Sequence, residues 1–364
     1  MKRRLRLALV GGGNPLGIAQ LHLMGARLDG RYELAAGCFS RDAQRNAAAA
    51  ERLTVARERC YADFAAMAEA EAKRPDRADL VSVLTGNDSH VAISRAFVER
   101  GFNVMCEKPL AVETAPALGL RDAVRRAKTA FALAHYFAGF AMLRQARAMV
   151  AAGTLGAVRM VQAEHASEGL ALGRPDGRPP LGVIADLAVH AAFTVGFVTG
   201  QPVEKLCADA HAVTPGRPVE DDARLLLHLR GGGRAAVWVS HAAAGLRRSI
   251  RLRVTGAKGT LEWDVEQPNI LRHTPVGEAT RLIQRGAEGL DETAGAASRI
   301  PSGHAEGTIE AFATLYRDLA ETIENTGKPV LYPTIDDAVA GAAFIETAYR
   351  SVKNGGAWTD MPKI

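Results

Sequence analysis

Over its first 135 residues the chain alternates short apolar runs with helical patterns, and this alternation restricts the possible fold more than any other feature. Each apolar run has the length of a strand, and helical patterns fill the intervals. Such an order is typical of βαβ units, whose strands lie parallel in one sheet. The expected strands cover residues 5–13, 32–40, 79–87, 102–109 and 130–137.

Beyond about residue 155 the pattern changes to strands joined by glycine turns. In SIRLRVTG, the apolar Leu252 and Val254 alternate with Arg251 and Arg253. This alternation predicts an antiparallel sheet with one face exposed to solvent. The chain is therefore expected to contain a nucleotide-type α/β domain over residues 1–135, followed by an α+β domain over residues 136–364.

Three segments near the end of the chain complete this outline. Residues 274–307 are rich in Gly, Ala, Thr and charged residues, and they are predicted to form a long loop. Helical patterns follow at residues 309–323 and 335–352. The helix at 335–352 is expected to pack back on the first domain.

Composition argues against several classes of protein. The net charge is +5, from 45 basic and 40 acidic residues, and the basic residues are dispersed without interleaved aromatic ones, so no nucleic-acid partner is expected. No stretch reaches the roughly 20 apolar residues of a membrane span, so no membrane partner is expected either. The start, MKRRLRLALVGGG, resembles a signal peptide, but its apolar run is short and ends at glycines, so a first strand is predicted instead.

The cysteines are scattered along the chain. Cys38, Cys60, Cys106 and Cys207 include no C-x-x-C pair, which argues against a disulfide framework and against zinc. A cytoplasmic protein without a metal site is expected.

The first predicted strand runs into the loop GGGNPLG, which contains Gly11, Gly13 and Gly17. A dinucleotide fingerprint, G-x-G-x-x-G, lets the backbone approach a pyrophosphate at the N-terminus of the next helix. Here the third glycine comes one position late, because Leu16 occupies its place. Glycines after a strand can also serve only a tight turn, but their position in the first βαβ unit favours a bound dinucleotide.

The end of the second predicted strand bears on which dinucleotide binds. An acidic residue there would accept hydrogen bonds from a free ribose 2′-hydroxyl. This chain instead has Ser40 and Arg41, with Asp42 just beyond. A hydroxyl and a guanidinium favour the 2′-phosphate of NADP over NAD, although Arg41 can also be a solvated residue in the first turn of a helix.

A helical stretch over residues 183–198 is apolar or glycine except for Asp186, His190 and Thr194. Their spacing of four places all three on one helical face. A carboxylate in apolar surroundings is costly unless it is paired or functional. Either the pair fixes the packing of the helix, or His190 exchanges a proton while Asp186 orients it and biases its pKa upward.

The run NVMCEKPLAV places Lys108 at the end of a predicted buried strand. The carboxyl ends of parallel strands form the crevice in which open α/β sheets bind ligands. A lysine there can contact a substrate, or it can extend to solvent beside a turn. With His190 moving a proton, Lys108 hydrogen-bonding the reacting oxygen and a nicotinamide carrying the hydride, the residues suit hydride transfer.

Taken together, these motifs resemble the glucose–fructose oxidoreductase/inositol dehydrogenase (Gfo/Idh/MocA) family over nearly the whole chain, from GGGNPLGIAQLH through CEKPLAV to AFIETAYRSVKNGGAW. The resemblance implies that the lysine of E-K-P, Lys108, is catalytic, and that the family's D-x-G-x-H pair falls on Asp186 and His190. Its T-P-N-x-x-H cofactor segment falls on TGNDSH. The residues expected to bind the cofactor are Gly11, Gly13, Asn14, Pro15, Leu16, Ser40, Arg41, Thr85, Asn87, His90, Glu107 and Lys108.

The resemblance also implies a fold and a reaction. The fold is an α/β Rossmann domain plus an α+β domain with an open, mostly antiparallel sheet, through which the chain would form a homodimer or homotetramer. The reaction is NAD(P)-dependent oxidation or reduction of a sugar, cyclitol or related polyol. Two alternatives are a glycosidase that uses bound NAD for oxidation, elimination and reduction in turn, and a non-catalytic regulator that senses NAD(P). The retained Lys108, Asp186 and His190 argue against the regulator.

The sequence departs from the family pattern in ways that leave the substrate open. Gly86 replaces a proline, Ala188 replaces a glycine, and Pro15 and Leu16 alter the phosphate loop. The segment 166–183 is short and lacks an expected Trp and Arg. Arg174 and Arg178 are candidate substitutes, and Thr194 and His304 are candidate substrate contacts, although a histidine in a loop such as SGHAEG is often only a surface residue.

Overall fold

The computed structural model describes residues 3–169 and 181–364, and the chain forms two compact units. The first unit comprises the chain up to Gly139 together with Thr308–Val339. The second comprises Phe140–Gly307 together with Ala340–Ile364. The α/β character of the first unit and the mostly antiparallel sheet of the second confirm the predicted fold class.

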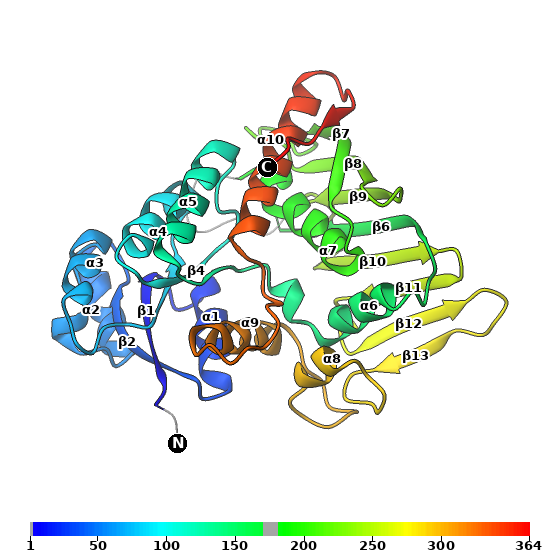
Figure 1. Ribbon diagram of the computed structural model, residues 1–364. Helices are drawn as coiled ribbons and strands as arrows, with labels where there is room; N and C mark the ends of the chain where they lie inside the picture. The colour runs from blue at the N-terminus through cyan, green and yellow to red at the C-terminus, as the bar shows by residue number, and fades with distance from the viewer. Residues whose placement is uncertain (1–2, 170–180) are drawn as a thin grey trace. The chain divides into compact units, whose positions relative to one another are not determined.

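Within the described residues, five parallel strands form the sheet of the first unit in the order β2-β1-β3-β4-β5 (Figure 1). β1 therefore lies between β2 and β3, and the chain changes direction across the sheet at this point. Ligands of open α/β sheets bind beyond the carboxyl ends of the strands at such a switch point. The strands are β1 (Leu5–Gly11), β2 (Tyr32–Cys38), β3 (Leu80–Leu84), β4 (Asn103–Cys106) and β5 (Phe131–Leu133). The helices are α1 (Ile18–Leu28), α2 (Ala43–Arg52), α3 (Phe64–Ala72), α4 (His90–Val98), α5 (Thr114–Ala127) and α9 (Thr308–Ile323).

The observed division of the chain differs from the predicted one in its last third. α9 lies beside α1 in the first unit, and a Cβ atom on Gly25 of α1 would lie only 2.7 Å from the Cβ atom of Phe312 (Figure 1). The helix α10 (Ile335–Lys353) belongs to the second unit from Ala340 onward, where the Ser351 hydroxyl accepts a hydrogen bond of 3.0 Å from the amide of Ala208. These contacts join residues far apart in the sequence, so local patterns do not reveal them.

The described part of the second unit contains a sheet of nine strands, in the order β13-β12-β11-β10-β6-β9-β8-β7-β14. β6 and β9 run parallel, and the other neighbouring pairs are antiparallel. The strands are β6 (Val158–Ala166), β7 (Val203–His211), β8 (Asp222–Leu229), β9 (Arg234–Ser240), β10 (Ser249–Gly256), β11 (Gly259–Asp264), β12 (Ile270–Pro275), β13 (Arg281–Gln284) and β14 (Thr359–Asp360). The other helices of this unit are α6 (Ala141–Ala151), α7 (Val189–Thr199) and α8 (Glu292–Ala296).

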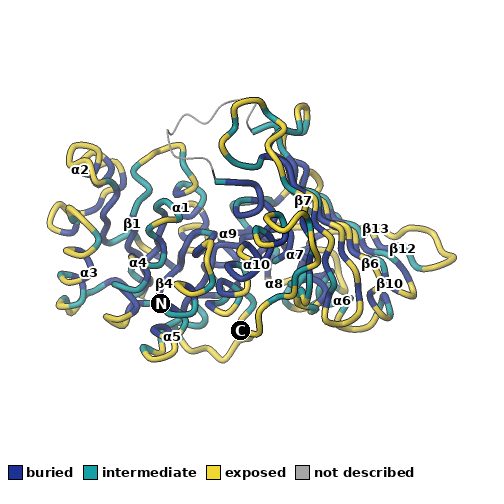
Figure 2. The backbone as a smooth tube through the Cα atoms, turned by 90° about the horizontal axis from the view of Figure 1, so that it is seen from above, coloured by how far each residue is buried: buried dark blue, intermediate teal, exposed yellow. Residues whose placement is uncertain are grey.

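The two faces of this sheet differ in character. α6 and α7 cover one face (Figure 1), and buried and exposed residues alternate along the strands (Figure 2). Leu252 and Val254 belong to the core, whereas Arg251 and Arg253 of the same strand are exposed. This confirms the alternation read from the sequence.

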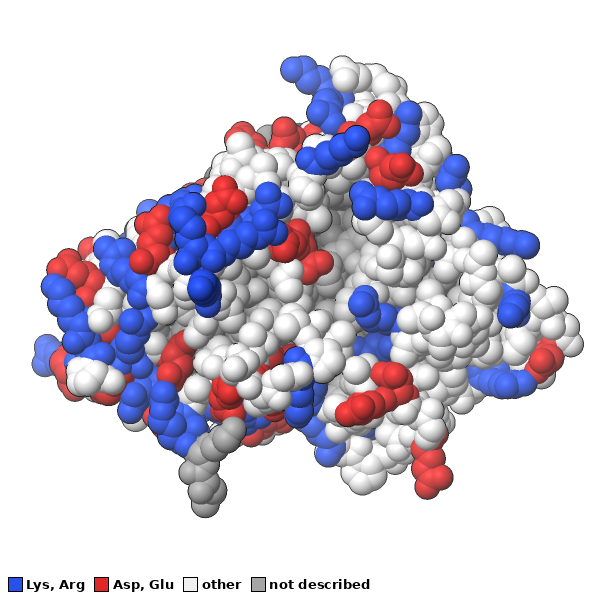
Figure 3. Space-filling model, viewed as in Figure 1, with Lys and Arg blue, Asp and Glu red and all other residues white. Residues whose placement is uncertain are grey.

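On the side of the molecule that Figure 3 shows, basic side chains are interspersed with acidic ones and form no continuous stripe. No helix in the described part of the chain is long and apolar enough to cross a membrane.

Two local predictions need correction. Residues 274–307 are not one long loop, because they contain β13 and α8. β13 is only four residues long and lacks a clear apolar alternation, and its pairing with β12 holds it in place. The helix predicted over residues 183–198 begins with a π-helical segment, Ile184–Ala188, before α7. Single π turns of this kind are frequent at functional sites.

Candidate active site

The glycine loop lies at the carboxyl end of β1. A Cβ atom on Gly11 would lie 2.7 Å from the Leu84 carbonyl oxygen, and one on Gly13 would lie 2.8 Å from the Phe39 carbonyl oxygen. Gly11 also has a φ of +91°, which glycine adopts readily. Both positions therefore require glycine because neighbouring backbone lies so close to them, whether or not they also contact a ligand.

The later part of the loop is open. A Cβ atom on Gly17 would meet only ordinary contacts, and Gly17 at the N-cap of α1 offers no side-chain oxygen to the first amides of the helix. The Asn14 side chain instead accepts a hydrogen bond from the amide of Leu16, whose side chain is 93% exposed. Free amides at a helix N-terminus after a glycine turn suit a pyrophosphate.

Two arginines lie near the carboxyl end of β2. Arg41 is exposed, as expected for a contact with a ligand and equally for a solvated residue. Asp42 caps α2 by accepting from the amide of Arg45 at 2.8 Å, so this carboxylate is committed to the helix. Arg52, which the sequence reading did not single out, donates to the carbonyl oxygen of Gly13 at 3.1 Å. It therefore places a second guanidinium beside the glycine loop.

The segment TGNDSH connects β3 to α4. His90 is 1% exposed, and its Nδ1 and Nε2 atoms lie 2.8 Å and 3.1 Å from the carbonyl oxygens of Pro109 and Thr85. Carbonyls only accept, so both contacts are hydrogen bonds when both nitrogens carry protons. Burial alone would lower the pKa of His90, but Cys106, the Pro109 carbonyl and Glu107 raise it to about 9. His90 is thus a buried cation that ties the end of β3 to the E-K-P turn.

The neighbouring residues of this segment have local partners. The Thr85 hydroxyl lies 2.7 Å from that of Ser89, and Asn87 begins a short 3-10 turn that precedes α4. Because both ring nitrogens of His90 face backbone carbonyl oxygens, His90 would support a cofactor by fixing these loops and not through its ring nitrogens.

The E-K-P turn follows β4. The Glu107 carboxylate is buried: one oxygen lies 2.8 Å from Nε2 of His22 and the other accepts from the backbone amide of Lys108 at 3.0 Å. Burial raises the pKa of Glu107, but His22, Lys108 and His90 together lower it below its usual value. Burial, assisted by the charge of Lys108, lowers the pKa of His135 to about 3, so His135 is neutral. Lys108 therefore lies beside one buried anion and one buried neutral histidine.

In the second unit, Asp186 lies in the π-helical segment and His190 in the first turn of α7. Asp186 makes a hydrogen bond of 2.9 Å to Nε2 of His241, which follows β9. The His190 ring is 4% exposed and lies 5.8 Å from that of His165. Helical spacing predicted a partnership between Asp186 and His190, which stays a prediction, and this hydrogen bond gives Asp186 a partner 55 positions away.

The candidate substrate residues have definite surroundings. The Thr194 hydroxyl donates to the backbone carbonyl of His190 at 2.8 Å. His304 is exposed, and its carbonyl accepts from the buried Arg285 at 2.6 Å, which fixes its loop. Arg174 and Arg178 lie outside the described residues.

Several neighbours of the predicted residues were missed. His241 comes directly after β9, and His135 comes two residues after the end of β5, so a search for histidines near strand ends would have found both. His22 lies inside a helix pattern and gives no such signal.

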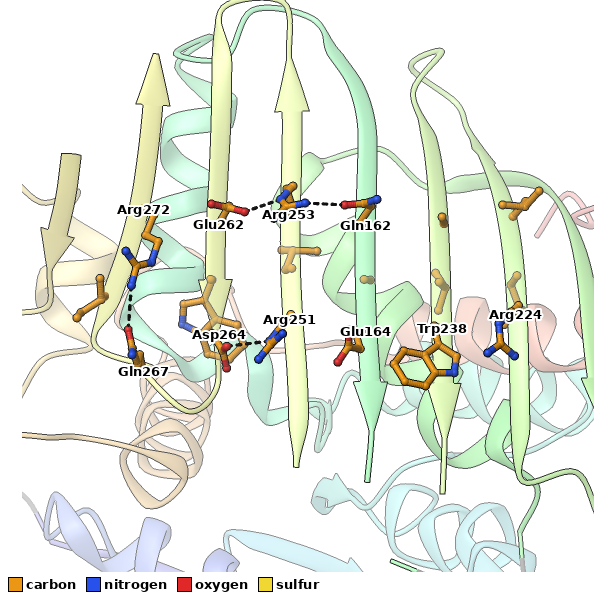
Figure 4. Close-up of a pocket in the computed structure, with 18 residues that line it drawn as sticks. Gln162, Glu164, Arg224, Trp238, Arg251, Arg253, Glu262, Asp264, Gln267 and Arg272 are labelled. Carbon is orange, nitrogen blue, oxygen red and sulfur yellow. Dashed lines mark hydrogen bonds and ion pairs between the residues drawn. The ribbon is translucent and has the colours of Figure 1, made fainter. Parts of the chain in front are cut away.

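A separate hollow of about 690 Å³ lies on the outer face of the second unit's sheet (Figure 4). It is crossed by polar ladders, among them hydrogen bonds of 2.9 Å from Arg251 to Asp264 and of 3.0 Å from Arg253 to Gln162. None of the predicted site residues is among the described residues that line it. It is a feature of the open sheet face and not the predicted site.

The parallel sheet with its glycine loop, followed by the open sheet, defines a dinucleotide-binding oxidoreductase. Residues 5–135 match the family model described as "Oxidoreductase family, NAD-binding Rossmann fold", and residues 143–262 match the GFO/IDH/MocA C-terminal domain. The chain belongs to the GFO/IDH/MocA family of oxidoreductases, as its motifs predicted.

Individual proteins support this assignment. An uncharacterized oxidoreductase, YfiI, from Bacillus subtilis is 30% identical, with 99% of this chain and 98% of that protein covered. An oxidoreductase structure from Sinorhizobium meliloti is 38% identical, with 99% and 100% covered and a TM-score of 0.92. An inositol dehydrogenase homolog from Azotobacter vinelandii, solved with NADH and myo-inositol, is 33% identical, with 98% of each chain covered and a TM-score of 0.93.

Proposed function

We propose that this oxidoreductase transfers a hydride between a nicotinamide dinucleotide and a CH–OH carbon of a sugar, cyclitol or related polyol. The observation that carries the proposal is the placement of Lys108 at the carboxyl end of β4, where a buried carboxylate holds its backbone. The similarity to an inositol dehydrogenase homolog solved with NADH and myo-inositol supports the substrate class.

The chain's own residues fit a bound dinucleotide. Only glycine fits at positions 11 and 13, and the open amides at the start of α1 suit a pyrophosphate. When bound, the nicotinamide supplies the hydride acceptor or donor. In the direction of oxidation, Lys108 hydrogen-bonds the substrate oxygen, His190 accepts the hydroxyl proton, and a carbonyl forms as the hydride leaves the carbon. Reduction reverses these steps.

Asp186 would support this proton transfer through its own partner. Its hydrogen bond to His241 fixes the carboxylate on the same face of the helix from which His190 projects. We assign catalytic roles to Lys108, Asp186 and His190, and a positioning role to His241.

For the cofactor, we propose a preference for NADP over NAD. The support is the absence of a carboxylate from Ser40-Arg41 at the end of β2, the use of Asp42 as a helix cap, and the second guanidinium of Arg52 beside the glycine loop. A 2′-phosphate would gain a charge-assisted hydrogen bond from each guanidinium.

We further propose that the protein is a cytoplasmic homodimer or homotetramer that associates through the open face of its second sheet. Met160, Leu226 and Leu282 are more than half exposed, and the charged ladders of Figure 4 are of both signs, as a self-complementary surface requires. All four cysteines are free thiols, in keeping with a reducing compartment. Sedimentation velocity of the wild type and of Leu226→Asp would test the association.

A substrate screen tests the central proposal. Cyclitols that include myo-inositol, sugars and glycosides are each offered with the oxidised or reduced cofactor, and nicotinamide absorbance is followed. We expect the wild type to turn over at least one of these compounds, and we expect Lys108→Met to abolish that turnover. Nucleotide that stays bound through purification, with cleavage of glycosides and no net change in absorbance, would favour the redox-elimination glycosidase instead.

A further inference from the structure

Four buried side chains form a hydrogen-bonded series that ends at Lys108 and joins four parts of the first unit: β3, α9, α1 and the E-K-P turn. Ser82 of β3 lies 2.8 Å from the hydroxyl of Tyr316 in α9, and that hydroxyl lies 2.8 Å from Nδ1 of His22 in α1. Nε2 of His22 lies 2.8 Å from Glu107, whose other oxygen accepts from the amide of Lys108 at 3.0 Å. None of the four side-chain residues is more than 8% exposed.

The chemistry of the groups gives this series a direction. The pKa of Glu107 is lowered, so the carboxylate is ionised near neutral pH and only accepts hydrogen bonds. His22 must then carry a proton on Nε2. Nδ1 faces the Tyr316 hydroxyl, which stays protonated because burial raises its pKa; when Tyr316 donates to Nδ1, it accepts from Ser82. Each donor in the series then points toward Glu107.

A buried carboxylate is an expensive way to stabilise a fold. An apolar side chain of similar volume often fills such a site at equal or better stability, whereas an ion left without its partner costs much more. The series ends at Glu107, which accepts from the amide of Lys108. This end point indicates a role in holding Lys108.

We propose that Ser82, Tyr316, His22 and Glu107 form a positioning network for Lys108, which fixes its backbone and keeps a negative charge beside its ammonium group. The network also ties this lysine to α1, the helix that follows the glycine loop. The inference rests on the proposed catalytic role of Lys108. The network residues themselves act through Lys108, so they are positioning residues.

The alternative is that the network only braces the core, and the chain offers a matched control. Tyr32 has a ring 5.5 Å from that of Tyr316, is 3% exposed, and donates its hydroxyl to the Tyr316 backbone carbonyl at 3.0 Å. Tyr316→Phe and Tyr32→Phe each remove one buried hydroxyl from the same region and keep the ring. Only Tyr316→Phe removes a hydroxyl from the network.

The experiment compares the two variants on the full-length protein with the substrate found in the screen. For Tyr316→Phe we expect kcat to fall about 10- to 100-fold, as a displaced catalytic group typically causes, with the KM for nucleotide little changed. Tyr32→Phe should stay within about twofold of the wild-type kcat, while both variants lower the melting temperature to a similar extent.

The pH profile adds a readout that a bracing role would not move. His22, Lys108 and His90 lower the pKa of Glu107, and Tyr316 is the other titratable group facing it. Without the Tyr316 hydroxyl, Nδ1 of His22 loses its partner and Nε2–H becomes a weaker donor to Glu107, so the pKa of Glu107 should rise. The loss of kcat that protonation of Glu107 causes, at lower pH than the limb assigned to His190, should therefore begin at higher pH in Tyr316→Phe and not in Tyr32→Phe. Histidine-labelled NMR should show a slowly exchanging Nε2 proton on His22 that exchanges faster in Tyr316→Phe than in Tyr32→Phe, because the ring is then held only by Glu107.

Each outcome has a distinct meaning. Equal kcat in the two tyrosine variants, or a Glu107 limb that does not move, overturns the positioning network while the role of Lys108 stands. Wild-type turnover in a folded Lys108→Met protein overturns the proposed function itself, and the network with it.

Discussion

The buried histidine between β3 and the E-K-P turn should make the stability of the first unit depend on pH. His90 donates to the Thr85 and Pro109 carbonyls when both ring nitrogens carry protons, and its pKa is raised to about 9 from 6.5. Because the folded-state pKa lies above the unfolded one, the stabilisation is complete below about pH 6.5 and is lost as the pH rises through 9. At about 1.4 kcal/mol per pH unit, the full difference corresponds to about 3 kcal/mol.

The perturbation is His90→Gln, which keeps one donor and cannot become charged in this range. The free energy of unfolding of the wild type should fall by up to about 3 kcal/mol between pH 6.5 and 9.5, and that of the variant should change much less. All three tryptophans lie in the second unit, so their fluorescence does not report on this region. Hydrogen–deuterium exchange of peptides covering residues 80–84 and 103–109, measured across this pH range, would give the local opening free energy. The same pH dependence in the wild type and in His90→Gln would refute the argument.

Three further predictions concern the site. Lys108→Met should lower kcat about 100-fold or more while nucleotide affinity and melting temperature change little, which calorimetry and steady-state kinetics would check; wild-type kcat would exclude a catalytic role. Arg41→Ala should weaken NADP binding by calorimetry and leave NAD binding nearly unchanged, and tighter binding of NAD by the wild type would contradict the cofactor proposal. His190→Asn should remove the limb of the pH profile of kcat that lies close to or above the unperturbed histidine pKa of about 6.5. His241→Asn should lower kcat and keep that limb. An unchanged pH profile in His190→Asn would return this helix to a packing role.

The outline of the fold could be predicted from the sequence. Strand and helix periodicities, the glycine loop and the strand-end position of Lys108 depend on neighbours within about four residues along the chain. Backbone sterics and side-chain direction act over this range. The missed β13 has too few residues for a period to emerge, and it exists because β12 offers it a partner.

The partners of the site residues were decided only by the tertiary structure. Helical spacing predicts that Asp186 partners His190, and the structure adds a hydrogen bond from His241 on another element. Glu107 meets His22 across 85 positions, and His22 meets Tyr316 across 294. Spacing identifies side chains that share one helix or strand, because element geometry fixes their directions. Which elements meet depends on the packing of the whole core, so the sequence alone determined where the reactive groups lie along the chain, and the folded core determined what holds each of them.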